Sequence, residues 1–127
     1  KTADKGEHSF TYAMYLHDNE LGVDTLAYSY ELNKPLEVIR HATDSISLAS
    51  TDNENVVIET IKKSHTDDGI ILRLFESQGK PAICSINTIF KYTEVFETDL
   101  MENEFNKIDI TSLSFTPFEI KTIKLKW

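Results

Sequence analysis

Two apolar runs separated by a short polar segment dominate the hydropathy pattern of this chain. Residues 55–63 (NVVIETIKK) and 70–76 (IILRLFE) are rich in β-branched and aliphatic side chains, and the segment between them closes on Asp68-Gly69. Two such runs joined by a loop of about 4–6 residues indicate an antiparallel hairpin. Neither alternating face of the first run is purely polar. We therefore expect the hairpin to lie in the middle of a sandwich rather than at a free edge.

Further alternating segments predict strands on both sides of this hairpin. Residues 7–17, 82–87 and 90–100 alternate with the strand period, and the first of them has two fairly apolar faces. The acidic segment 101–107 lacks such a pattern, and we expect it to loop outward.

One stretch follows the helical period instead and predicts a short amphipathic helix near residues 20–32. Asp18 or Asn19 is expected to cap its start, and Asn33 with Pro35 to end it. The apolar positions that set this period are Val23, Leu26, Ala27 and Tyr30.

The C-terminal run, residues 113–127, changes its apolar phase after Pro117. A slip of one residue near Lys121 and Thr122 predicts a β-bulge, because a period of two otherwise sends Ile120 and Ile123 to opposite faces. Three lysines have the spacing of outward positions that guard a sheet edge: Lys121, Lys124 and Lys126.

These elements predict an all-β fold, namely an antiparallel β-sandwich of seven or so short strands with one short α-helix against an edge or end. At 127 residues the chain can bury a core as one domain. A soft boundary near residues 40–44 also allows a subdivision into a strand-helix unit, 1–40, and a β-sandwich, 41–127.

Charge and cysteine content narrow the classes of partner. With 21 acidic and 13 basic residues the net charge is -8, which argues against nucleic acid or an anionic membrane as the main partner. There is no apolar run near 18 residues and no secretory leader pattern. Cys84 is the only cysteine, so no internal disulfide can form, which fits a reducing compartment.

Candidate metal ligands do not have the spacing of a known site. None of the four histidines follows the H-x-H, H-x3-H or HExxH pattern, and Cys84 has no CxxC partner. The adjacent pair His17-Asp18 could offer two ligands, but a site needs three or four. Turn or surface positions are therefore expected for His8, His17, His41 and His65.

Glu59 and Glu76 flank the hairpin and form the one carboxylate pair that could suit glycoside hydrolysis, which needs one protonated and one ionised carboxyl group. Lys62, Lys63 and Arg73 lie in the same hairpin, so cross-strand ion pairing is the simpler expectation.

Aromatic residues open another hypothesis, a face that stacks on sugar rings. The simpler interpretation is that alternating aromatic residues form core and cross-strand pairs. The residues concerned are Tyr12, Tyr15, Tyr28, Tyr30, Tyr92 and Trp127.

Four ordered segments span nearly the whole chain and carry a specific resemblance. They are ADKGEHSFTYAMYLH (3–17), LNKPL (32–36), the two hairpin runs with their flanks (55–63 and 68–76) and LSFTPFEIKTI (113–123). In this order they resemble the C-terminal β region of family 38 glycoside hydrolases, the α-mannosidases. The resemblance is closer to the bacterial and cytosolic branch than to the lysosomal or Golgi one.

This resemblance implies a retaining α-mannosidase that uses a divalent metal, usually zinc, with an aspartate nucleophile and an acid/base carboxylate in an N-terminal α/β domain. None of those groups maps onto this sequence. The resemblance therefore implies no catalytic, cofactor-binding or metal residue here, and implies that residues 1–127 are the C-terminal β-domain region of a longer chain.

The role implied is to brace the catalytic and remaining β domains of the same chain, in a cytoplasmic enzyme that hydrolyses terminal α-mannosides. Because the chain begins with Lys1 rather than methionine, we also expect a piece of a longer protein. The two apolar faces of residues 10–16 leave a homo-oligomer open. An independent carbohydrate-binding or protein-interaction module remains the alternative.

Overall fold

The computed structural model describes residues 5–17, 20–34, 36–38 and 45–127. The chain divides into two compact units, Lys1–Val38 and Ile39–Trp127, and each is described by itself. The boundary predicted near residues 40–44 falls outside the described residues. Within the described part, no helix has the length and apolar character needed to cross a membrane.

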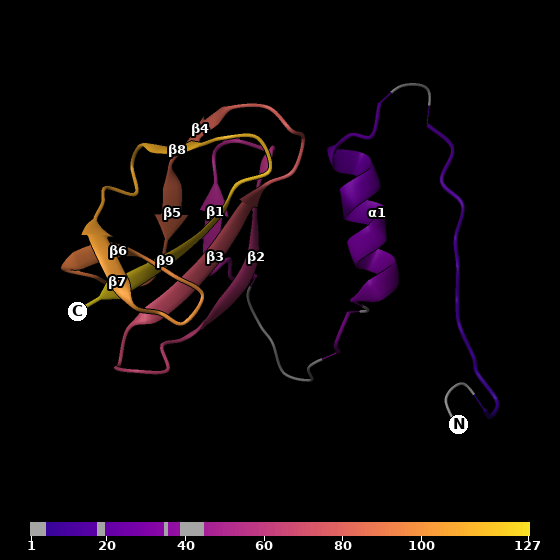
Figure 1. The fold of residues 1–127 in the computed structure, drawn as a ribbon, viewed down its shortest axis with the longest axis horizontal. Coiled ribbons are helices and arrows are strands. Elements are labelled where there is room, and N and C mark those ends of the chain that lie inside the picture. The colour runs from indigo at the N-terminus through magenta and orange to yellow at the C-terminus, as the bar shows by residue number, and fades with distance from the viewer. Residues whose placement is uncertain (1–4, 18–19, 35, 39–44) are drawn as a thin grey trace. The chain divides into compact units, whose positions relative to one another are not determined.

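The first unit contains the helix that the sequence predicts, α1, which spans Val23–Asn33 (Figure 1). Its end at Asn33 is confirmed, and Lys34 N–H donates to the carbonyl of Tyr30. The caps predicted for its start are wrong, because the N-cap is Gly22 and no side chain caps the helix. Asp18 and Asn19 precede that position and lie outside the described residues. No residue of α1 is buried, so the unit gives this helix little packing.

The strand predicted at residues 7–17 is wrong as a sheet element. The segment runs as an elongated chain (Figure 1), and residues 5–17 belong to no strand. The alternating pattern can favour an extended backbone, but a strand requires a neighbour for its ladder. None of the described sheets provides one for these residues.

The second unit confirms the predicted class of fold, an antiparallel sandwich, and its described residues form nine strands rather than about seven. A five-stranded sheet in the order β2-β3-β9-β6-β7 is accompanied by two-stranded sheets β1-β5 and β4-β8. The bounds are β1 Ala49–Thr51, β2 Val56–Lys63, β3 Ile70–Glu76, β4 Ala82–Cys84, β5 Ile86–Thr88, β6 Glu94–Thr98, β7 Glu104–Lys107, β8 Leu113–Phe115 and β9 Ile120–Lys126.

The core lies between the large sheet and the two small ones. Leu72, Leu74, Ile123 and Leu125 of the central strands are fully buried, and the same cluster contains residues of β4, β5, β6 and β8. Sandwich cores form in this way, because inward side chains of facing sheets interdigitate. The core therefore joins all three sheets of the unit.

The predicted hairpin is confirmed as β2 and β3, paired antiparallel from Val56–Glu76 to Lys63–Ile70. The predicted place inside the sandwich is confirmed for β3, which is internal, and is wrong for β2, which is an edge strand. The ladder shifts register between Ile58 and Thr60, which places a bulge at Glu59. Bulges and lysines protect an edge strand from pairing with other chains. The apolar residues of β2 therefore reflect packing on one face, not a central place in the sheet.

The bulge predicted near Lys121 and Thr122 is also wrong. Strand β9 pairs regularly with β3, from Phe75–Ile120 to Ile70–Leu125. Ile120 and Ile123 do point to opposite faces, and Ile120 is exposed. The apparent phase slip arises because β9 has neighbours on both sides and buries consecutive residues from Thr122 to Leu125.

The acidic segment 101–107 is not wholly a loop, since Glu104–Lys107 forms β7 and pairs with β6. All four side chains of β7 are exposed. Its sequence therefore shows no apolar alternation, and the strand is held by backbone pairing to β6 and by ion pairs of Glu104 and Lys107. Side-chain periodicity cannot predict a strand of this kind, which explains why β7 was expected to be a loop.

Candidate functional site

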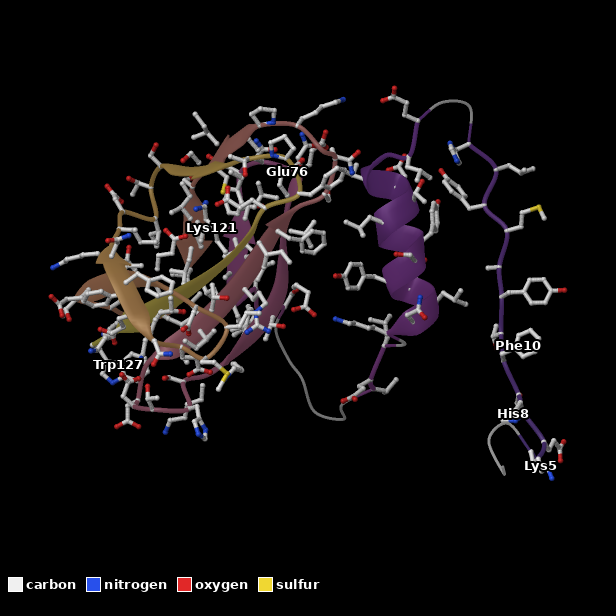
Figure 2. All side chains as sticks on the ribbon, viewed as in Figure 1. Lys5, His8, Phe10, Glu76, Lys121 and Trp127 are labelled. Carbon is white, nitrogen blue, oxygen red and sulfur yellow. The ribbon has the colours of Figure 1, made fainter. Side chains whose placement is uncertain are left out.

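Glu76 is the most unusual candidate residue, because its carboxylate is buried and is held by backbone donors. It lies at the end of β3 (Figure 2), 1% exposed. Oε1 accepts the N–H of Gln78 at 2.8 Å, and Oε2 accepts those of Gly79 at 2.8 Å and Phe118 at 2.9 Å. The N–H of Lys80 is 3.2 Å from Oε2. The carboxylate thus joins the turn after β3 to the turn before β9.

The local backbone explains why glycine occupies position 79. Gly79 and Phe118 both have left-handed backbone angles, with φ of 68° and 59°. A Cβ on Gly79 would also lie 2.6 Å from the Phe118 ring. Only glycine avoids both the conformational strain and the clash.

Glu76 cannot act as the protonated member of a glycosidase pair. Burial raises the pKa of Glu76, but the four backbone N–H donors outweigh burial and hold it below its usual value. A general acid needs a raised pKa. Glu59 lies in the exposed bulge of β2. It is three positions from Val56, the residue that pairs with Glu76, and three positions of a strand span about 10 Å. The two glutamates therefore form no catalytic pair.

The cross-strand ion pairs expected for these glutamates are wrong for Glu76, which binds backbone N–H groups instead. The hairpin lysines pair elsewhere: Lys62 with Glu102, and Lys63 with Asp68 at 2.8 Å.

A second charged cluster holds the tip of the β2–β3 hairpin against the β6–β7 loop. Glu102 is buried and accepts bonds from the Lys62 ammonium, the Ser64 hydroxyl (3.1 Å) and the His65 N–H (2.6 Å). The Lys62 ammonium is the largest cause that lowers the pKa of Glu102 to about 2. We call the residues Lys62, Ser64, Asp67, Glu102, Glu104 and Lys124 the hairpin-tip cluster.

Lys124 completes this cluster and contradicts the expected solvated lysine face. It is 2% exposed, and its ammonium lies 2.8 Å from Asp67 and 3.3 Å from Glu104. The bond from Lys124 is the first cause that lowers the pKa of Asp67 to about 2. Lys121, which lies in β9 like Lys124, forms ion pairs with Glu97 of β6 and with Glu119 just before β9 (Figure 2 labels Lys121). The lysines of β9 are paired because β9 is central rather than at an edge.

The hairpin-tip cluster predicts a loss of stability in acid. The pKa of Glu102 falls from 4.5 to about 2 on folding, so protonation favours the unfolded chain. Its stabilisation is present above about pH 4.5 and is lost as the pH falls toward 2. We expect about 1–3 kcal/mol from Glu102, reduced by the partial exposure of Lys62. Urea unfolding at pH 6, 4 and 3 should show this decrease in the free energy of unfolding.

Glu102→Gln should make this pH dependence less steep, because one of the titrating carboxyl groups of the cluster is then absent while Asp67 remains. The same series on Glu54→Gln, an exposed residue, is the matched control and should retain the slope of the parent chain. Equal slopes for Glu102→Gln and the parent would rule out the assignment to Glu102.

The histidines and the cysteine fall at separate places in the described chain. His8, His17 and His65 are exposed, and His41 lies outside the described residues. Among the described residues, no three histidine, cysteine, aspartate or glutamate side chains come together as metal ligands would. Cys84 is buried, and burial raises the pKa of its thiol to about 11. A thiol of that pKa is a poor nucleophile at neutral pH.

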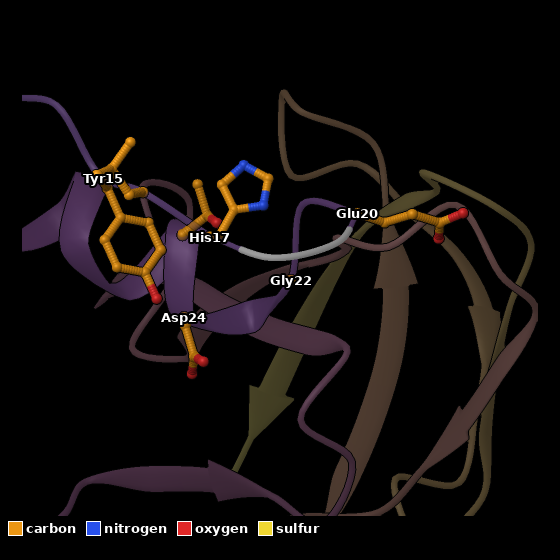
Figure 3. A pocket seen from close by; sticks show the side chains of 7 residues that line it. Tyr15, His17, Glu20, Gly22 and Asp24 are labelled. Carbon is orange, nitrogen blue, oxygen red and sulfur yellow. The ribbon is translucent and has the colours of Figure 1, made fainter.

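A hollow of about 320 Å³ occurs in the first unit beside the start of α1. Figure 3 shows that the side chains of His17, Glu20 and Asp24 on its walls point in different directions. These groups do not converge on one point, as a catalytic or metal site requires.

A smaller hollow of about 220 Å³ lies on the β-sandwich, where Glu97, Asp109 and Lys121 meet the hydroxyls of Ser112 and Ser114. Its charged groups are already paired with protein groups: Lys121 with Glu97, and Asp109 with the N–H and hydroxyl of Thr111. Its groups are therefore already used in stabilising the fold.

The aromatic residues do not form the expected core, because most of them are exposed. Among the described members of this set, only Tyr15 and Tyr28 contact each other, with ring centroids 4.6 Å apart. The six belong to both units, and Figure 2 labels Trp127 at the chain end. The exposed members are Tyr12 (83%), Trp127 (60%), Tyr28 (51%), Tyr15 (41%) and Tyr92 (40%).

Sequence reasoning missed Glu102, Asp67 and the buried state of Lys124. Asp67 did carry a local signal, because an aspartate two residues before a glycine often accepts the N–H of that glycine, as here at 3.0 Å. Glu102 carried none, since its partners lie 37 to 40 positions away along the chain.

Comparison with known proteins identifies the part of the chain that forms the sandwich. The family model for the glycosyl hydrolases family 38 C-terminal β-sandwich domain matches residues 55–123. Alpha-mannosidase 2C1 of Mus musculus is 33% identical over 98% of the chain, and that of Homo sapiens 31% over 98%. Alpha-mannosidase of Saccharomyces cerevisiae is 26% identical over 97%.

The matches cover nearly the whole of this chain but only a small part of each relative. They cover only 13% of the mouse and human proteins and 14% of the yeast protein. The family model spans more than half of the 127 residues and lies within the antiparallel unit, from the start of β2 into β9. The chain therefore belongs to the glycosyl hydrolase family 38 C-terminal β-sandwich domain family.

Proposed function

We propose that this chain is a non-catalytic C-terminal β-sandwich segment of an α-mannosidase that hydrolyses terminal α-mannosides. Its role is to pack on the catalytic and remaining β domains of the same longer chain. The observation that carries this proposal is the match over nearly the whole chain to α-mannosidases of which it covers about an eighth. A second observation supports it: the candidate acid, Glu76, is held ionised by backbone N–H groups.

The divalent metal implied for such an enzyme does not fit the residues described here. Three convergent nitrogen, sulfur or carboxylate ligands are needed for a catalytic zinc, and the described side chains offer no such group. We place the metal, the nucleophile and the acid/base in the part of the enzyme outside these residues.

Two further properties belong to the proposal. The first is the bacterial and cytosolic branch of the family with a cytoplasmic location, supported by the single cysteine, which fits a reducing compartment. The second is that neither nucleic acid nor membrane is a partner, supported by the net charge of -8. A homo-oligomer of the whole enzyme is compatible with both.

The purified 127-residue chain should not cleave an aryl α-mannoside, with or without added zinc. Its charged clusters stabilise the fold, and the pKa values of the buried carboxyl groups Glu76 and Glu102 are lowered, whereas the general acid of glycoside hydrolysis needs a raised pKa. Release of the aryl group, followed by absorbance at substrate concentrations up to millimolar, measures the expected absence of turnover.

A longer chain that contains residues 1–127 is the positive control and should be active in the same assay. Turnover by the 127-residue chain at a rate that survives repurification would contradict the proposal. Saturable binding of mannose by this chain in calorimetry would instead favour the alternative, a carbohydrate-binding module.

A further inference from the structure

The N-terminal segment presents a row of bare apolar side chains. Phe10, Tyr12, Met14 and Leu16 occur at alternate positions and are 81–85% exposed. Alternate residues of an extended chain share one face. A contiguous apolar row of this kind is rare on the surface of a complete protein and marks an interaction surface.

The opposite face of the same segment is already used within its unit. Ala13, Tyr15 and His17 line a hollow with residues of α1, and the Tyr15 ring lies 4.6 Å from that of Tyr28. The segment therefore has one face toward a helix and one face without cover. Figure 2 shows this elongated segment with Phe10 and His8 labelled along it.

The backbone of this segment is also unpaired, since none of the described sheets includes residues 5–17. A strand with apolar side chains gains stability from a neighbouring strand and from a layer over its free face. The segment has the sequence and the extended backbone of a strand but neither of these contacts.

We propose that residues 8–16 form an inserted strand in a β-sheet of the longer enzyme, with Phe10, Tyr12, Met14 and Leu16 covered by a second apolar layer. The partner is the part of the same chain outside residues 1–127. This rests on the proposed function, and the chain covers only 13–14% of its relatives, which leaves ample chain to provide a sheet.

The free edges of the five-stranded sheet, β2 and β7, are poor partners for this strand. β2 has a bulge at Glu59 and ends in Lys62-Lys63, and β7 exposes Glu104 and Lys107. Such edges oppose the addition of another strand. The same features argue against a second copy of this chain as the partner.

Hydrogen exchange with peptide mass analysis tests the proposal on the longer chain and on residues 1–127 side by side. In the longer chain the amides of residues 8–16 should exchange on the order of 1,000-fold more slowly than in the 127-residue chain, because ladder bonds protect them. In the longer chain, Tyr12→Ser should reduce this protection. Thr11→Ser, one residue away on the other face, is the matched control and should leave the protection unchanged.

Each outcome separates this inference from the proposed function. A longer chain that cleaves an aryl α-mannoside but exchanges the amides of residues 8–16 as fast as the 127-residue chain overturns the strand and retains the function. Protection without mannosidase activity contradicts the function and retains the strand. Protection that appears in the 127-residue chain as its concentration rises overturns the proposal, because it assigns the face to a second copy.

Discussion

Replacing Glu76 by glutamine is expected to destabilise the β-sandwich by about 2–4 kcal/mol, because a buried charged acceptor of several N–H groups is lost. In the parent chain both oxygens of Glu76 accept: Oε1 from Gln78, and Oε2 from Gly79 and Phe118. A glutamine presents one oxygen and one N–H2 group. Whichever way the amide turns, at least one backbone donor then faces another donor. Urea unfolding at neutral pH measures the loss.

Glu59→Gln is the matched control, because it makes the same chemical change at an exposed bulge in the same hairpin. Its effect should stay within about 0.5 kcal/mol, as for other surface substitutions. The pair also tests the assignment of roles. If the longer enzyme lost its activity with Glu76→Gln while the sandwich kept its stability, Glu76 would be a functional residue rather than a structural one.

The second large effect is expected at the centre of the core. Leu72 is fully buried, pairs with Ile61 on β2 and Ile123 on β9, and belongs to the cluster that joins all three sheets. Leu72→Ala should lower the free energy of unfolding by about 2–5 kcal/mol, because it removes buried methyl groups and leaves a cavity. That is a large part of the 5–15 kcal/mol typical of a domain.

Ile83→Ala controls for the loss of an aliphatic side chain from a strand, since Ile83 lies in β4 and is 67% exposed. We expect it to cost less than about 1 kcal/mol. If Leu72→Ala does not fold, Leu72→Val provides a smaller cavity and a measurable transition. Equal unfolding midpoints for Leu72→Val and Ile83→Ala would contradict the proposed centre of the core.

The hairpin shows what local pattern can predict. Two β-branched runs around Asp68-Gly69 give β2 and β3 close to their observed bounds, because a strand and a turn are specified by neighbouring residues. The order of strands in the sheet is specified by distant residues. The pattern could not show that β2 is at the edge, because an edge strand whose one face is buried has the same composition as a central one.

Strand β9 shows the converse error. The apparent slip in phase near Lys121 predicts a bulge and solvated lysines, whereas the strand is regular and Lys124 is buried. A buried lysine is tolerated only when it is paired, and the carboxylates that pair with Lys124, Asp67 and Glu104, lie far from it along the chain. Periodicity alone could not reveal that arrangement.

The sequence by itself determined the class of fold, the hairpin, the end of α1 and the resemblance to the α-mannosidases, since these follow from local propensity and from ordered motifs. Only the tertiary structure decided that the ionised Glu76 carboxylate binds backbone N–H groups of two turns and that Lys124 is buried in a central strand. It also decided that residues 5–17 have no sheet of their own. The physical reason is that burial, pKa and strand pairing depend on neighbours brought together by folding, and those neighbours are distant in the chain.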